Sequence, residues 1–125
     1  MVVHGDDGLD ELPLTGKTNV WELRDNEIIS YGMEPTDFGL SLASIDTILG
    51  GSPEHNAFMI RRVLMGERGS HRDIVLWNSA AALMVGDKTR SIEEGLELAE
   101  QSIDSGQALS KLESLSEFSQ SVEYY

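Results

Sequence analysis

Four carboxylates lie within six positions near the N-terminus, in the stretch 6–11, which we call the acidic loop. Carboxylates held together in one loop repel one another unless a cation or solvent compensates. Mg²⁺ is usually held by one or two carboxylates plus substrate phosphates, and Asp10 and Glu11 could supply such a pair. A solvated turn is the alternative, because short acidic clusters are common at strand ends.

The other side chains that could do chemistry form weaker patterns. The three histidines are far apart in the sequence and share no periodicity, so we predict no histidine metal site. Four arginines fall between positions 61 and 72, and we expect them to solvate a helix end and offset its dipole. No serine lies in a nucleophile-elbow pattern, and the chain has no cysteine to act as a nucleophile or thiolate ligand.

Length, net charge and hydropathy indicate a protein with one hydrophobic core and no nucleic-acid or membrane partner. A chain of 125 residues is long enough for one hydrophobic core. The 9 basic and 22 acidic side chains give a formal net charge of −13, so we expect no nucleic-acid partner. The longest apolar tract, Ala80 to Val85, is far shorter than the roughly 20 residues that cross a bilayer, so we expect no membrane role. The absence of cysteine is compatible with the cytoplasm, where we expect the protein.

The elements that must position the acidic loop come in the order strands first, helices second. Val2 and Val3 are predicted to end a short strand that runs directly into the loop. The stretches Thr18 to Leu23 and Glu27 to Tyr31 predict a β-hairpin. Three short strands cannot bury several helical faces well, so we expect the sheet to be incomplete and its open edges to favour self-association.

About four helical segments follow. A first, short helix is predicted over Ser41 to Leu49, ended by two glycines. The second begins at the N-cap Ser52 and ends by Gly66, with Ala57, Ile60 and Leu64 on its buried face. A third helix is predicted over about 73–85, at the centre of the core. A fourth is capped by Ser91 and Glu94 and has Ile103 in its buried stripe. We expect a break at Gly106 and a polar tail at 122–125 that frays.

Two asparagines, Asn56 and Asn78, lie on predicted helices with apolar faces. A polar amide in such a place needs a hydrogen-bond partner, so we expect each to bond to a neighbouring loop.

The run from Val2 to Glu11 is similar to the strand-and-loop signature of anthranilate phosphoribosyltransferases, of the glycosyltransferase family 3 type. In that family an Asp-Glu pair holds magnesium on phosphoribosyl pyrophosphate. The likeness continues in order along the chain, at 20–23, 35–40, 50–51, 56–57, 78–81, 94–95, 99, 103–108 and 112. Two positions depart from the usual pattern, with Thr36 in place of glutamate and Ser79 in place of alanine.

The resemblance implies an α/β fold, with residues 1–125 forming one C-terminal segment of the family's α/β domain. It implies Asp10 and Glu11 as magnesium ligands in an enzyme that transfers phosphoribose from phosphoribosyl pyrophosphate to anthranilate, in tryptophan biosynthesis. The family's glycine-rich phosphate loop and N-terminal helical domain have no counterpart here, since Gly50-Gly51-Ser52-Pro53 is better explained as a helix stop and an N-cap. We therefore expect the segment to be inactive by itself.

Two other interpretations stay open at this stage. The chain could be a non-catalytic interaction module whose exposed sheet edge pairs with a partner. It could also be a segment of a pyrimidine nucleoside phosphorylase, although the Asp-Glu pair after Gly8-Leu9 disfavours that family.

Overall fold

The structure is a computed structural model that describes residues 1–121. The tail 122–125, for which we predicted fraying, lies outside the described residues. Three strands form one antiparallel sheet in the order β1 (Val2–Gly5), β2 (Thr18–Arg24) and β3 (Glu27–Met33). The predicted strand and hairpin are confirmed.

The hairpin and the two faces of the sheet follow from local sequence. Asp25 and Asn26 have φ values of 50° and 65°, which a tight type I′ connection requires at both central positions. Successive side chains of a strand point to opposite faces, so Thr18 and Val20 are buried while Trp21 beside them is 44% exposed. The strands β1 and β3 form the outer edges of the sheet.

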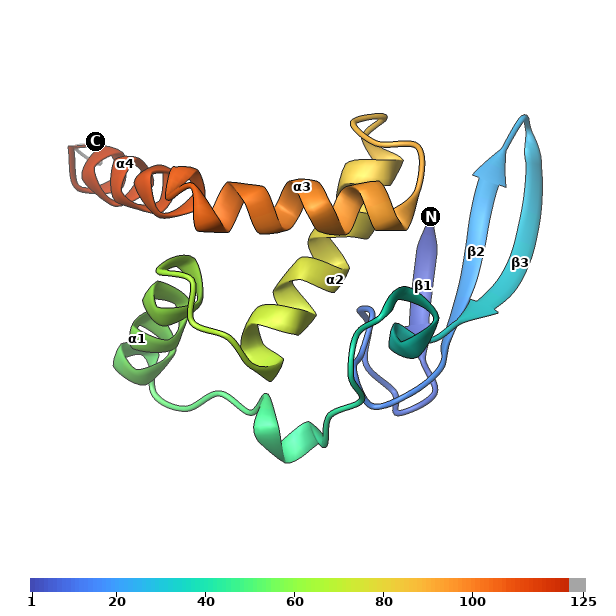
Figure 1. Cartoon of the computed structure of the whole chain (residues 1–125), viewed down its shortest axis with the longest axis horizontal. Coiled ribbons are helices and arrows are strands. Elements are labelled where there is room, and N and C mark those ends of the chain that lie inside the picture. The colour runs from blue at the N-terminus through green and yellow to red at the C-terminus, as the bar shows by residue number, and fades with distance from the viewer. Residues whose placement is uncertain (122–125) are drawn as a thin grey trace, which may run out of the picture.

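Four α-helices follow the sheet after two short 3₁₀ turns, η1 (Pro35–Phe38) and η2 (Ile45–Thr47); the number agrees with the prediction, but one predicted helix is not among them. They are α1 (Pro53–Leu64), α2 (Ser70–Val85), α3 (Ile92–Asp104) and α4 (Gln107–Ser121). In Figure 1, α3 and α4 run one after the other along the top, α2 rises from the lower centre and crosses α3, and α1 lies at the lower left. No helix within residues 1–121 is both long and apolar enough to cross a membrane.

The helix predicted over Ser41 to Leu49 is wrong, because only the single turn η2 forms there. The Ser44 hydroxyl accepts a bond from the Asp46 N–H, and the Thr47 hydroxyl donates to the Ser44 carbonyl at 2.7 Å. Such short side chains compete with the backbone bonds of a helix. The N–H of Ala43 also donates to the Leu14 carbonyl at 2.9 Å, which ties the preceding stretch, outside any helix, to the segment that follows the acidic loop.

The helix caps are as predicted, with one shift. Ser52 caps α1 by accepting from the His55 N–H, and Ser91 caps α3 by accepting from the Glu94 N–H. The Glu94 carboxylate accepts a hydrogen bond from the N–H of Arg90, the residue before the N-cap, whereas in a standard capping box it accepts from the N–H of the N-cap itself. The predicted buried face of α1 is wrong: Ala57 and Ile60 are exposed and Leu64 is only partly buried. The buried residue of the helix is Val63.

Helix α2 lies at the centre of the core, as predicted, with a different cluster on each side. Trp77 and Ala80 pack with residues of the sheet and of the segment after the acidic loop. Leu76 packs with Ala99 and other residues of the helical half. Gly95 of α3 lies against α2 so closely that a Cβ built on it would be 2.7 Å from the Ala80 carbonyl oxygen. The helix thus joins the sheet to the helical half of the molecule.

Candidate functional site

The acidic loop begins where β1 ends and folds back on itself. The N–H of Gly5 donates to the Leu9 carbonyl, and the N–H of Gly8 donates to the Gly5 carbonyl, both at 2.9 Å. Gly8 has a φ of 94°, a conformation that glycine adopts without steric cost. This tight turn carries the chain away from the sheet just before Asp10 and Glu11.

Two of the four loop carboxylates are engaged in shaping the loop. Asp6 accepts a hydrogen bond from the Asn19 side chain at 2.7 Å. Asp7 accepts from the Thr15 hydroxyl and, at 3.0 Å, from the Leu9 N–H. The hydrogen bond from Thr15 is the main reason that the pKa of Asp7 is lowered from its ordinary value. Both side chains therefore act as hydrogen-bond acceptors within the protein.

Asp10 and Glu11 are exposed, and no hydrogen bond or salt bridge to either side chain occurs within residues 1–121. Partial burial raises the pKa of the Glu11 carboxyl, and the negative charges of Asp10 and Asp7 raise it further. The two carboxylates thus keep their oxygen atoms available, and a cation beside them would relieve their repulsion.

The carboxylate oxygens of Asp10 and Glu11 can form part of the ligand shell of a magnesium ion. Carboxylate oxygens are hard ligands, and Mg²⁺ is usually held by one or two of them while it keeps waters and binds substrate phosphates. Over the described part of the chain, no three acidic or histidine side chains come together as a complete metal site. Asp10 and Glu11 would therefore hold the ion together with ligands from outside the protein.

The position of the pair is set by the residue that follows it. The Asn78 side chain on α2 accepts a bond from the Leu12 N–H and donates one to the Leu12 carbonyl, each at 2.9 Å. Leu12 and Leu14 are 1% and 0% exposed, so the chain enters the core immediately after Glu11. The expectation that Asn78 bonds to a loop is confirmed. Which loop it binds did not follow from the sequence, although the apolar run after Glu11 was a signal that this segment is buried.

Within residues 1–121, two of the four arginines at positions 61–72 have ion-pair partners, and the role predicted for Arg72 is wrong, because its side chain is buried near the start of α2 and does not solvate a helix end. Arg72 is 2% exposed and pairs with Asp104 at 2.7 Å and with Glu100 at 3.2 Å, which joins the start of α2 to the end of α3. Arg62 pairs with Glu67 just beyond the end of α1. These contacts leave neither arginine free to bind a phosphate.

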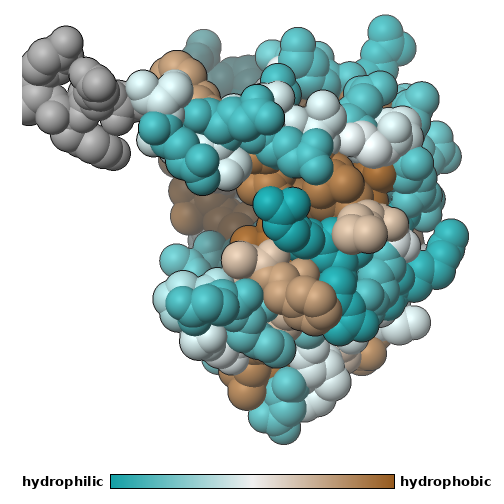
Figure 2. Space-filling view, turned by 90° about the vertical axis from the view of Figure 1, so that its left-hand side faces the viewer, coloured by the Kyte–Doolittle hydropathy of each residue, from teal (hydrophilic) through white to brown (hydrophobic). Residues whose placement is uncertain are grey.

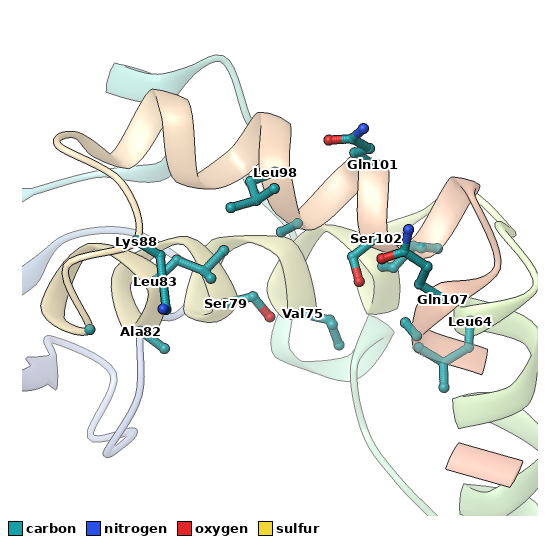
Figure 3. Close-up of a pocket in the computed structure, with 14 residues that line it drawn as sticks. Leu64, Val75, Ser79, Ala82, Leu83, Lys88, Leu98, Gln101, Ser102 and Gln107 are labelled. Atoms are coloured by element: carbon teal, nitrogen blue, oxygen red, sulfur yellow. The ribbon is translucent and has the colours of Figure 1, made fainter. Parts of the chain in front are cut away.

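A groove of about 660 Å³ lies among the helices, away from the acidic loop. The face on which α1 and α4 lie is hollowed and its recess is apolar (Figure 2). Figure 3 shows Val75, Leu83 and Leu98 along the groove, with the amides of Gln101 and Gln107 near its far end. No residue of the acidic loop lines it, so it is not the candidate site.

Comparisons with known proteins show which family the chain resembles. Residues 1–109 match the family model described as glycosyl transferase family, a/b domain. The chain is 52% identical over 125 residues to an anthranilate phosphoribosyltransferase of Acetivibrio thermocellus, covering 100% of this chain and 36% of that enzyme. It is 48% identical over 124 residues to the enzyme of that name from Dehalococcoides mccartyi (strain 195), covering 98% of this chain and 36% of the relative.

Solved structures show the same likeness. Anthranilate phosphoribosyltransferase from Thermus thermophilus superposes with a TM-score of 0.81 at 38% identity, over 89% of this chain and 32% of that one. The Saccharomyces cerevisiae enzyme in complex with PRPP and Mg gives a TM-score of 0.79 at 32% identity, over 89% and 32% of the two chains. The chain spans about a third of the length of these relatives. Because the family model matches 109 of the 125 residues, the chain belongs to the glycosyl transferase family and corresponds to its α/β domain.

Proposed function

We propose that this chain supplies the metal-binding edge of an anthranilate phosphoribosyltransferase, with Asp10 and Glu11 holding Mg²⁺. The substrates would be phosphoribosyl pyrophosphate and anthranilate, the pathway tryptophan biosynthesis and the location the cytoplasm. The identity of 52% over all 125 residues supports this activity, as does the yeast relative's complex with PRPP and Mg. The relatives named above all carry the same enzyme name, which favours this activity over phosphorolysis.

The metal assignment rests on one observation: the four carboxylates of the acidic loop fall into two pairs with different hydrogen bonding. Asp6 and Asp7 accept hydrogen bonds from Asn19 and Thr15, while Asp10 and Glu11 keep their oxygens free of such bonds in the described part of the chain. The loop therefore has two carboxylates that hold its shape and two that can bind a cation.

A bound Mg²⁺ would neutralise the charge that develops on the departing pyrophosphate. Asp10 and Glu11 would orient that ion and take no part as nucleophiles or proton carriers. Asp7 and Gly8 would keep the loop in the turn that presents the pair. Because two carboxylates leave most of the coordination shell to water and phosphate, we expect weak binding by the protein alone and tighter binding with the donor present.

A chimeric enzyme tests the proposal. Residues 1–125 would replace the aligned 125 residues of the Acetivibrio thermocellus enzyme, and the product would be assayed for phosphoribosyl transfer to anthranilate with Mg²⁺. We expect transfer, and we expect Asp10→Asn with Glu11→Gln to lower kcat/KM by about 100-fold or more, as loss of a metal ligand pair does. Asp46→Asn, an exposed carboxylate on η2, is the control and should keep activity. An active chimera that tolerates the double substitution would disprove the metal role.

A second candidate, a non-catalytic interaction module, is favoured by one feature of the sheet. The strands β1 and β3 have open outer edges, and the sheet exposes Val2, Trp21, Leu23 and Ile28. Open edges and exposed apolar side chains favour association between chains. Sedimentation of the chain with and without Mg²⁺ and phosphoribosyl pyrophosphate separates the two: a defined oligomer that ignores both ligands favours the module.

A further inference from the structure

The side chain of Asn78 pairs with the backbone of Leu12, as a neighbouring strand would in a sheet. Its amide oxygen accepts from the Leu12 N–H and its amide nitrogen donates to the Leu12 carbonyl, so both backbone groups of one residue are satisfied by one side chain. The same nitrogen also donates to the Ile74 carbonyl at 3.0 Å, one turn earlier in α2. This third bond fixes the orientation of the amide, which lies 66 positions away from Leu12 in the sequence.

The contact lies at one end of the acidic loop. At the other end, the N–H of Asp6 donates to the Lys17 carbonyl at 2.9 Å, where β1 and β2 pair. Leu12 follows Glu11 directly and is buried, so its backbone can shift only if the bonds to Asn78 break. A residue next to such an anchor has its Cα held about 3.8 Å from a fixed point.

We propose that Asn78 is a positioning residue, which holds the backbone of Leu12 so that the carboxylates of Asp10 and Glu11 face one cation. The inference rests on the function proposed above. It concerns how the loop is held and assigns no ligand role to Asn78 itself. Groups that orient metal ligands through a second layer of hydrogen bonds commonly change metal affinity by about 10- to 100-fold when they are removed.

The chain contains a matched control for this bond pattern. Asn56 on α1 accepts from the Gly51 N–H at 2.7 Å and donates to the Gly51 carbonyl at 3.3 Å. The chemistry is the same, but the bonds are local, exposed and made to a segment that is remote from the acidic loop in the sequence. A purely structural role predicts that loss of either asparagine acts alike, whereas a positioning role predicts that only Asn78 affects the metal.

The test compares Asn78→Leu and Asn56→Leu with the wild-type chain, using Mn²⁺ alone as the probe. Electron paramagnetic resonance of free Mn²⁺ gives the affinity, and amide hydrogen exchange followed by NMR reports on the Leu12 N–H. We expect Asn78→Leu to weaken Mn²⁺ binding by about 10-fold and to expose the Leu12 amide to exchange. We expect Asn56→Leu to leave Mn²⁺ binding close to that of the wild type.

Each remaining outcome decides whether Asn78 positions Asp10 and Glu11. A folded Asn78→Leu with wild-type Mn²⁺ affinity overturns the positioning role and leaves the proposed function standing. Equal losses in both variants also overturn it, because they show a general effect on folding. If circular dichroism shows that Asn78→Leu is unfolded, the smaller Asn78→Ala takes its place with the same expected values, and unfolding of both assigns Asn78 to structure alone. No Mn²⁺ binding by the wild type overturns the proposed function and, with it, this inference.

Discussion

Helix α2 and the acidic loop are joined through Asn78, but different forces fix them. On α2, Trp77 and Leu76 are 0% and 6% exposed, so burial of large apolar side chains holds the helix. In the loop, the carboxylates are exposed and the shape depends on a few hydrogen bonds, each of which contributes little net stability.

Stability therefore depends mainly on the residues of α2, and the proposed metal binding depends on those of the acidic loop. Substitutions on α2 should change the free energy of unfolding, and substitutions of the loop carboxylates should change metal binding with little effect on the fold. Asn78 is the exception, because it belongs to the helix and acts on the loop.

The largest effect is expected from Trp77→Ala. The indole is fully buried and its ring centroid lies 5.0 Å from that of Phe38, so truncation leaves a cavity between α2 and η1. We expect the free energy of unfolding to fall by about 3–5 kcal/mol, measured by urea denaturation. The other tryptophan, Trp21, is 44% exposed and serves as the control, with a much smaller loss for Trp21→Ala. Equal losses would mean that α2 is not the centre of the core.

A smaller effect is expected from Gly95→Ala, which tests the contact between α2 and α3. The new Cβ would lie 2.7 Å from the carbonyl oxygen and 2.8 Å from the Cα of Ala80, both backbone atoms. Overpacking of this kind costs about 1–3 kcal/mol. Gly16→Ala is the control, because a Cβ there meets nothing within 4 Å. A net gain in stability for Gly95→Ala, from the better helix propensity of alanine, would show that the two helices separate at little cost.

A pH-dependent effect on stability is expected at the ion pair between Arg72 of α2 and Asp104 of α3. The hydrogen bond from Arg72 lowers the pKa of Asp104 below its ordinary value of 3.8. A carboxyl with a lowered folded-state pKa contributes stability that is present above 3.8 and is lost as the pH falls through the folded-state pKa. Asp104→Asn should therefore flatten the decline of unfolding free energy below that pH.

The control for this pH series is Glu113→Gln, an exposed carboxylate on α4 with no salt bridge within residues 1–121. It should follow the wild-type curve. If Asp104→Asn also follows that curve, the ion pair with Arg72 does not contribute to stability in solution.

The smallest effect on stability is expected in the loop itself. Asp10 and Glu11 are exposed, and their charges repel, so Asp10→Asn with Glu11→Gln should change the free energy of unfolding by no more than about 0.5 kcal/mol, with a slight gain favoured. Thermal unfolding by calorimetry measures this change. A loss above about 1 kcal/mol would show that the pair forms structural contacts, and it would remove the contrast with α2.

Much of the fold was predictable because its signals are local. The caps Ser52 and Ser91 mark helix starts through bonds to residues three positions later, and the Asp25-Asn26 turn tolerates the positive φ that a tight hairpin needs. Each signal depends on neighbours in the sequence. The positions of the hairpin, α1 and α3 could therefore be predicted without the structure.

What could not be predicted depends on contacts between distant residues. The stretch 41–49 has a helix-like pattern, but the bond from Ala43 to Leu14 ties part of it to a distant segment, and only a single 3₁₀ turn forms. The partner of Asn78 is 66 positions away, so its hydrogen-bonding need was predictable and its role next to the acidic loop was not. The metal pair itself was selected from four carboxylates by resemblance, since spacing alone does not distinguish Asp10 and Glu11 from Asp6 and Asp7.

The most direct test of the metal pair is to map where Mn²⁺ binds on the ¹⁵N-labelled chain by paramagnetic line broadening. Substoichiometric Mn²⁺ should broaden the amide signals of the acidic loop and of Leu12 first, and Asp10→Asn with Glu11→Gln should abolish that preference. With a net charge of −13, the competing outcome is diffuse attraction to the whole surface. Broadening that is equally strong at the acidic start of α3, at Glu93 and Glu94, would contradict a specific site in the loop.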